Sequence, residues 1–125
     1  MSAHIEQMYA LLEVLRLAML EVGWWGERAP DAEALASTEP FCVDTLRFTE
    51  WLQWVYMPKM QAYIKQHQAL PERSGLFAIA EESWRGSDEN TEGLLLVVRT
   101  LDALVNGDVD IKQHMANVAV RYRQH

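Results

Sequence analysis

The sequence predicts an all-α fold, a single-domain bundle of four to five helices around a proline-kinked central helix. Apolar residues recur at steps of three and four positions over most of the chain, which is the period of an amphipathic helix. Glycine and proline divide these stretches, and none alternates as a β-strand does. A length of 125 residues fits one domain, so domain boundaries of 1–125 are expected.

The first helix is expected over residues 3–22, from an apolar stripe of Ile5, Met8, Leu12, Leu15, Met19 and Val22. Ser2 is a suitable N-cap, and Gly23 can adopt the left-handed conformation that ends a helix. The next segment is rich in glycine and proline, with one short helical turn expected from Pro30 to Ala36. We expect Trp24 and Trp25 to fold back over the end of the bundle.

The central helix is expected from a cap at Asp44 or Thr45 to about Gln66. At 100° per residue, one face carries Phe48, Trp51, Leu52, Val55, Ala62 and Tyr63, and the opposite side carries Met57, Met60 and Ile64. A helix that is apolar on most sides is packed on most sides, so this helix is placed at the centre of the bundle.

Pro58 interrupts this helix. Proline donates no N–H, and its ring crowds the carbonyl four residues back, which belongs to Trp54, so a kink is expected near Pro58. In the alternative, the helix ends at Met57 and a new one begins at Pro58.

A short amphipathic helix is expected over residues 76–84. Ser87 or Asp88 then caps a helix with a stripe of Leu94, Val98, Leu101 and Val105, which ends at Asn106-Gly107. A last helix over about 108–123 opens at Asp108 or Asp110 and is either one more bundle helix or a dimer contact.

Charge and composition exclude several classes of protein. The net charge is −7, and a nucleic-acid binder needs Lys and Arg to neutralise phosphates, so direct binding of nucleic acid is not expected. No apolar run approaches the roughly 20 residues of a membrane span, and no basic leader precedes the first apolar stretch. The single cysteine, Cys42, excludes an internal disulfide and is interpreted as a small buried residue. A cytoplasmic location is therefore expected.

The sequence contains none of the short motifs typical of phosphate binding, nucleophilic catalysis or metal binding. The glycines stand too far apart for a phosphate-binding loop, and no G-x-S-x-G motif is present. The histidines (His4, His67, His114 and His125) share no metal-ligand spacing and are interpreted as surface residues. We therefore predict no catalytic residue, no cofactor and no metal.

One stretch, "PFCVDTLRFTEWLQWVYMPKM", is still a candidate binding surface. Trp54 lies about 60° from the face of Trp51, on the side of Glu50, and Pro58 frees the carbonyl of Trp54. An acceptor, an indole N–H and a carboxylate can therefore meet there. Trp51 is expected in the core, and the surface is expected to comprise Phe41, Asp44, Glu50, Trp54 and Pro58. In the alternative, the cluster is only core.

The string "STEPFCVDTLRFTEWLQWVYMPKM", followed by "ALP" and "LDAL", closely resembles the YqcC-like family of small bacterial proteins, over about residues 3–105. The resemblance implies a cytoplasmic helical bundle that is linked by association to tRNA pseudouridine synthase C. Known pseudouridine synthases resemble one another in a β-rich catalytic domain with an aspartate nucleophile and a basic RNA groove, which this acidic helical chain does not suggest. The residues after Asn106 extend beyond the resemblance.

Three hypotheses of function follow. The first is a non-enzymatic interaction or accessory protein that binds an unidentified protein partner, as a monomer or weak homodimer, near tRNA modification. The second is an RNA-modification enzyme or a subunit of a tRNA pseudouridine synthase. The third is a small-ligand binder with a pocket between helices, because Trp and Met side chains often line such pockets.

Overall fold

A computed structural model describes residues 2–122, and every regular element among them is helical, which confirms the all-α single domain. The elements are α1 (Ala3–Val22), α2 (Ala32–Leu35), a 3-10 turn η1 (Pro40–Cys42), α3 (Phe48–Trp51), a π-helical turn η2 (Leu52–Tyr56), α4 (Met57–His67), α5 (Phe77–Ser83), α6 (Glu92–Asn106) and α7 (Ile111–Arg121). Arg123 and His125, which the sequence analysis also considered, lie outside the described residues.

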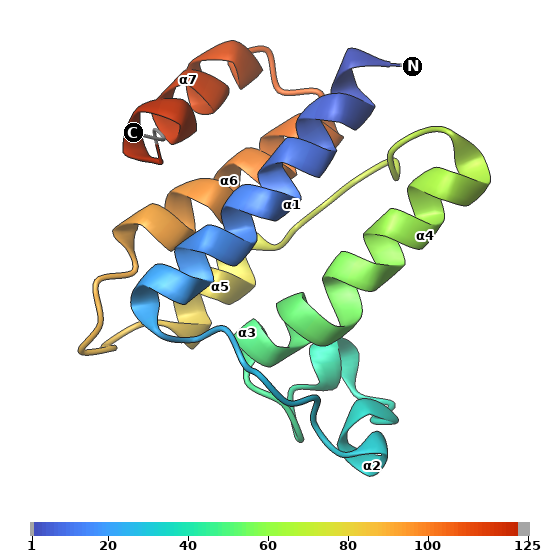
Figure 1. Cartoon of the computed structure of the whole chain (residues 1–125), viewed down its shortest axis with the longest axis vertical. Helices are drawn as coiled ribbons and strands as arrows, with labels where there is room; N and C mark the ends of the chain where they lie inside the picture. The colour runs from blue at the N-terminus through green and yellow to red at the C-terminus, as the bar shows by residue number, and fades with distance from the viewer. Residues whose placement is uncertain (1, 123–125) are drawn as a thin grey trace.

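The bundle is built around α1 and α6, which run side by side in opposite directions (Figure 1). α7 packs on α6, α4 runs along the other flank, and α5 bridges α3 and α6. The short elements α2, η1 and α3 gather at one end of the molecule, beside the loop that leaves α1. The candidate site is at this end.

The ends of α1 are where local sequence places them. The Ser2 hydroxyl accepts a hydrogen bond from the His4 N–H, and Gly23 ends the helix in the left-handed conformation at φ 86°. The apolar face of α1 is fully buried against the bundle, through Met8, Leu12, Leu15 and Met19 among others. The predictions for the first helix and for the short helical turn after it are confirmed.

The central helix does not begin where it was predicted. Arg47 is the N-cap of α3, and the Glu50 carboxylate accepts a hydrogen bond from the Arg47 N–H at 2.8 Å. Asp44 and Thr45 are not caps, because their side chains bond the preceding segment: Asp44 accepts from the Ser37 hydroxyl and Thr45 donates to the Ala34 carbonyl.

The kink expected at Pro58 is not confirmed. The helix instead contains a π-turn over Leu52–Tyr56, in which the Met57 N–H donates to the Leu52 carbonyl five residues back. Backbone angles stay right-handed helical at Trp51, Leu52, Tyr56 and Met57, so the chain continues from α3 into α4. Pro58 lacks the N–H that an α-helix would direct to the Trp54 carbonyl, and the α-helical pattern gives way to the π-turn at this point.

The π-turn changes which residues of α4 are buried. A π-turn holds one residue more than an α-turn, so side chains beyond it are rotated by about 100° from the α-helical continuation. Phe48, before the turn, and Leu52, at its first position, are buried as predicted; after the turn the buried residues are Met57, Met60 and Ile64, which the 100° spacing placed on the opposite side. The predicted face was therefore wrong beyond Tyr56: Ala62 is exposed, and Tyr63 is only half-buried.

The next two helices follow the prediction closely except at one cap. The expected helices over 76–84 and up to Asn106-Gly107 are α5 and α6, and Gly107 ends α6 at φ 69°. α6 begins at Glu92 after Thr91, so neither Ser87 nor Asp88 is its cap. The Ser87 hydroxyl instead accepts from the Glu89 N–H and closes a turn within the loop.

One carboxylate on α6 positions α5. Asp102 accepts hydrogen bonds from the Ser74 hydroxyl at 2.5 Å, the Leu76 N–H at 2.9 Å and the Phe77 N–H at 2.8 Å. Two of these donors are free backbone N–H groups at the start of α5, which a helix cannot pair internally. Asp102 therefore acts as an N-cap supplied from another helix, and α5 is held in place on α6.

α7 is the extra helix predicted after Asn106, and it covers one side of α6. Val118 is its one buried residue, with Ile111, Met115 and Tyr122 half-buried against the core. Gly93 of α6 permits the approach, because a Cβ there would collide with the Tyr122 hydroxyl. The tail is thus a bundle helix in this structure.

Candidate functional site

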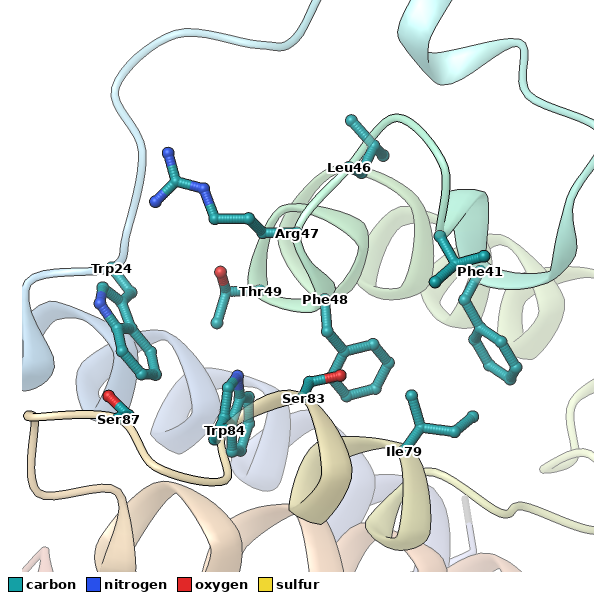
Figure 2. Close-up of a pocket in the computed structure, with 11 residues that line it drawn as sticks. Trp24, Phe41, Leu46, Arg47, Phe48, Thr49, Ile79, Ser83, Trp84 and Ser87 are labelled. Atoms are coloured by element: carbon teal, nitrogen blue, oxygen red, sulfur yellow. The ribbon is translucent and has the colours of Figure 1, made fainter.

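A pocket lined by aromatic rings opens at the end of the molecule where α3, α5 and the loops before α3 meet. Its volume is about 370 Å³. Its lining residues come from two segments of the chain: Trp24, Phe41, Val43, Leu46, Arg47, Phe48 and Thr49 from the first, and Ile79, Ser83, Trp84 and Ser87 from the second. Figure 2 shows that the segments face one another across the hollow.

Four aromatic rings form a row along the pocket (Figure 2). The centroid of Trp84 lies 5.9 Å from Trp24 on one side and 5.9 Å from Phe48 on the other, and Phe41 follows at 6.1 Å from Phe48. These separations are those of favourable aromatic pairs. Phe48 and Trp84 are buried, whereas Trp24 and Phe41 are half-buried. The row therefore combines a fixed interior with ring surface that a partner can reach.

Trp51 supports this row from behind. Its ring stacks on Phe48 at 5.7 Å with an angle of 9° between the planes, and it meets Phe41 edge-on at 4.9 Å. The sequence analysis expected Trp51 in the core. It packs against the core cluster but is only half-buried.

Four residues of the pocket lining carry polar side chains: Arg47, Thr49, Ser83 and Ser87. The Arg47 side chain is 82% exposed and extends over Thr49 toward Trp24 (Figure 2). Its Nε lies 3.8 Å from the Glu50 carboxylate, and Ser83 and Ser87 add hydroxyls from the second segment of the lining. No carboxylate lines the pocket. The arrangement can bind an apolar group, but it holds no acid or base beside that group.

A smaller hollow of about 190 Å³ adjoins the pocket and shares Trp24, Arg47 and Thr49 with it. Gln53 fixes its wall: the buried side-chain amide accepts from the Gly26 N–H at 2.8 Å and donates to the Gly26 carbonyl at 2.7 Å. This pair of hydrogen bonds fastens the loop after α1 to the π-turn. The loop carries Trp24 and Trp25, both half-buried against the core, as expected from the sequence.

The structure brings some of the predicted site residues together and leaves others apart. Phe41 lines the aromatic pocket, and Glu50 and Trp54 line the adjoining hollow. Asp44 and Pro58 are exposed and line neither. The carboxylate of Glu50 caps α3, so it is already engaged by the Arg47 N–H.

Sequence reasoning missed the wall of the pocket that α5 and the loop after it supply. Ile79, Ser83 and Trp84 lie more than 25 residues beyond α3, and only the packing of α5 on α3 brings them to the site. One signal was available: Trp84 is a large aromatic residue at the end of a short amphipathic helix, and such residues commonly pack against a neighbouring element.

The negative charge of the protein is concentrated around the pocket. Residues 24–50 and 79–92, which supply every lining residue, hold eleven carboxylates and three arginines, a net charge of −8. The remaining 84 residues hold seven carboxylates and eight bases, a net charge of +1. Two of the three arginines lie near carboxylates, Arg47 near Glu50 and Arg85 near Glu82 at 2.9 Å. The segments that build the pocket are therefore acidic overall, although Arg47 is the one charged residue in the pocket lining itself.

Other kinds of site receive no support from the described part of the chain. No three His, Cys, Asp or Glu side chains between residues 2 and 122 converge in a group that could hold a metal ion. Cys42 is buried, as expected from the sequence. Among the same residues, none of the helices has the length and hydropathy needed to span a membrane.

Comparison with known proteins gives a consistent set of relatives. The sequence profile of the DUF446 family, described as "tRNA pseudouridine synthase C", matches residues 7–104. An uncharacterised protein of Haemophilus influenzae is 37% identical over 97 residues, which cover 78% of this chain and 91% of the relative. The Escherichia coli protein YqcC is 35% identical over 100 residues, with coverage of 78% and 89%. No solved structure gives a significant match.

A third relative is a longer protein. The Pectobacterium carotovorum protein named tRNA pseudouridine synthase C is 37% identical over 86 residues, which cover 69% of this chain but only 23% of the relative. The same kind of sequence therefore forms nearly the whole of two proteins and less than a quarter of a third.

Proposed function

This chain belongs to the YqcC-like (DUF446) family, and we propose that it is a non-catalytic accessory protein that binds a tRNA pseudouridine synthase. The observation that carries the proposal is the Pectobacterium relative, in which a segment like this one belongs to a polypeptide named tRNA pseudouridine synthase C. About three quarters of that polypeptide lies outside the segment. Two domains that are joined in one polypeptide in one organism work in close proximity. We therefore expect the corresponding separate proteins of another organism to bind each other.

An accessory role suits the chemistry of the site better than catalysis does. Residues 2–122 contain helices and no strand, and the aromatic pocket has no carboxylate in its lining. Attack on a nucleobase by a side chain requires a positioned nucleophile, and base chemistry requires a titratable group within hydrogen-bond reach. An apolar pocket with exposed aromatic surface instead resembles the anchor sites of protein interfaces, where aromatic residues and arginine contribute most of the affinity.

The net charge supports a protein partner rather than the tRNA itself. At −7 the chain repels phosphate, so the RNA contacts would be made by the synthase. Under this proposal the protein works in the cytoplasm, where a tRNA-modifying enzyme meets its substrate.

The test is a binding measurement between this chain and the tRNA pseudouridine synthase C of the same organism. The two purified proteins should form a 1:1 complex in isothermal titration calorimetry, with a Kd of about 1 μM or lower. Size-exclusion chromatography should show the same stoichiometry. The absence of a complex at about 100 μM of each protein would contradict the proposal.

A second measurement separates the accessory role from a catalytic one. The isolated chain should convert no uridine to pseudouridine in tRNA, and its addition to the synthase should change the rate or the tRNA affinity of that enzyme. Turnover by the isolated chain that is lost in Glu50→Gln would contradict the accessory role.

A further inference from the structure

We propose that the aromatic pocket is the docking site for a Lys- and Arg-rich segment of the synthase that inserts one large apolar side chain. The inference rests on the proposed function and adds the location of the interface and the chemistry of the partner segment. Three observations carry it: the shape of the pocket, the charge around it and the way in which it is held open.

The pocket has the size and lining of an anchor site. A volume of about 370 Å³ is near the lower end of the range for ligand pockets, and it suits one aromatic or branched side chain. Phe48 and Trp84 are 7% and 8% exposed and form a fixed floor. Val43, at 72% exposed, leaves apolar surface on the edge that nothing in residues 2–122 covers. Burial of such an edge around a central anchor is typical of energetically important interface regions.

The charge around the pocket selects a basic partner segment. The two segments that build the pocket carry a net charge of −8, and the rest of the chain carries +1. A protein that binds tRNA presents Lys and Arg to the phosphates, so basic surface is available on a synthase. Opposite charges across an interface accelerate association and fix the relative orientation of the partners. The net negative charge of these two segments also disfavours a free anionic ligand or tRNA as the occupant, although Arg47 lines the pocket.

The walls are held by contacts outside the pocket, so the site exists before a partner arrives. Asp102 fastens the start of α5, which carries Ile79 and Ser83. Gln53 fastens the loop that carries Trp24 through its two hydrogen bonds to Gly26. A preformed site avoids part of the entropic cost of ordering an interface during binding.

The experiment compares matched surface substitutions for binding to the purified synthase. Val43→Lys removes apolar surface at the edge and places a cation there, whereas Val120→Lys makes the same change on α7, where Val120 is 66% exposed. Both positions are exposed, so both variants should fold and melt like the wild type, which thermal denaturation checks. Val43→Lys should weaken binding about tenfold or more, and Val120→Lys should change it less than about twofold.

A second pair of variants tests the charge. Asp88→Lys with Glu89→Lys, next to the pocket residue Ser87, should weaken binding and reduce its dependence on salt between about 50 and 300 mM NaCl. Glu72→Lys, in the loop between α4 and α5, is the control and should leave the salt dependence unchanged. A photo-crosslinking amino acid at position 43 should attach to a synthase peptide that contains Lys or Arg beside a large apolar residue.

The outcomes separate this inference from the function on which it rests. If the wild-type chain forms no complex with the synthase, the accessory function is wrong and this interface is wrong with it. If the complex forms but Val43→Lys binds as well as Val120→Lys, the accessory function stands and the pocket is not the interface. If Val43→Lys abolishes self-association of the isolated chain while synthase binding is unchanged, the face joins two copies and the proposal is overturned. Crosslinking to added tRNA instead of the synthase would also overturn it.

Discussion

Replacement of Asp102 by alanine should destabilise the protein by about 2–4 kcal/mol, although the residue lies on α6 and outside the pocket. Its carboxylate accepts three hydrogen bonds, from Ser74, Leu76 and Phe77, and two of them come from backbone N–H groups that start α5. A hydrogen bond to a charged group contributes about 1.5–3 kcal/mol, and the loss of an N-cap costs about 1 kcal/mol. Ser74 is only half-buried and can turn to water, so the two backbone donors account for most of the loss.

A conservative replacement separates the hydrogen bonds from the charge. Asp102→Asn keeps one acceptor oxygen and should cost about 1 kcal/mol, because asparagine caps a helix nearly as well as aspartate. Urea denaturation followed by circular dichroism would measure both variants, with an unchanged m-value as the sign of a two-state comparison. Asp88→Ala is the control, since this exposed carboxylate makes no hydrogen bond within the described residues, and it should change stability by less than about 0.5 kcal/mol.

Two results would refute this reasoning about Asp102. A loss below about 1 kcal/mol for Asp102→Ala would mean that the N–H groups of α5 find other acceptors at little cost. An equal loss for Asp102→Asn and Asp102→Ala would mean that the negative charge, and not the hydrogen-bond acceptors, holds α5.

Three further predictions concern the Gln53 hydrogen bonds, the pH dependence of stability and the effect of metal removal. Gln53→Ala should lower the free energy of unfolding by about 1–3 kcal/mol in urea denaturation because both hydrogen bonds to Gly26 are lost, and an equal effect of Gln61→Ala, on the exposed side of α4, would contradict this. Burial, with a smaller effect of the Asp102 charge, raises the pKa of Tyr56 above its ordinary value of 10.0. The unfolded chain therefore loses this proton first, so stability should be constant just below pH 10 and fall above it, and Tyr56→Phe should reduce that fall in denaturation curves recorded across this range. The melting temperature should be unchanged by excess EDTA in a thermal scan, and a large drop would reveal a metal that contributes to folding.

Helix ends that depend on neighbouring residues could be predicted from the sequence. Ser2 bonds a backbone N–H two residues away, and Gly23 and Gly107 take left-handed angles that glycine adopts at little cost. These interactions are local, so the residue types alone indicate them. The predicted caps at Asp44 and Ser87 were wrong, although the interactions involved are also local. Each side chain had another local partner, Ser37 for Asp44 and the Glu89 N–H for Ser87, and sequence spacing cannot rank such alternatives.

The π-turn explains the error in the face of α4. An apolar face predicted at 100° per residue assumes an unbroken α-helix. One extra residue in a turn rotates all the side chains that follow it about the helix axis. Pro58 drew attention to the correct place but suggested a bend rather than a change in helical period. Gln53 was expected to be a polar interruption, and its burial depends on Gly26 being within reach, 27 residues earlier in the chain.

The sequence could indicate the part of the candidate site around α3 but not the part that α5 supplies. Phe41, Glu50 and Trp54 belong to one stretch of sequence, so an aromatic-rich surface around α3 could be expected. Ile79 and Trp84 meet that surface only because α5 is capped from α6 and packs on α3. Such long-range placement leaves no mark in the local pattern of residues.

The placement of the tryptophans gives the molecule a built-in optical reporter. All five indole rings lie at one end: Trp24 and Trp84 in the aromatic pocket, Trp25 and Trp54 beside it, and Trp51 behind Phe48. Intrinsic tryptophan emission therefore originates from this end alone, and it includes the close pair Trp24 and Trp84, whose ring centroids lie 5.9 Å apart. An event at the opposite end, such as fraying of the first turn of α1, should leave the emission spectrum unchanged, whereas any molecule that excludes water from the tryptophan end should shift it.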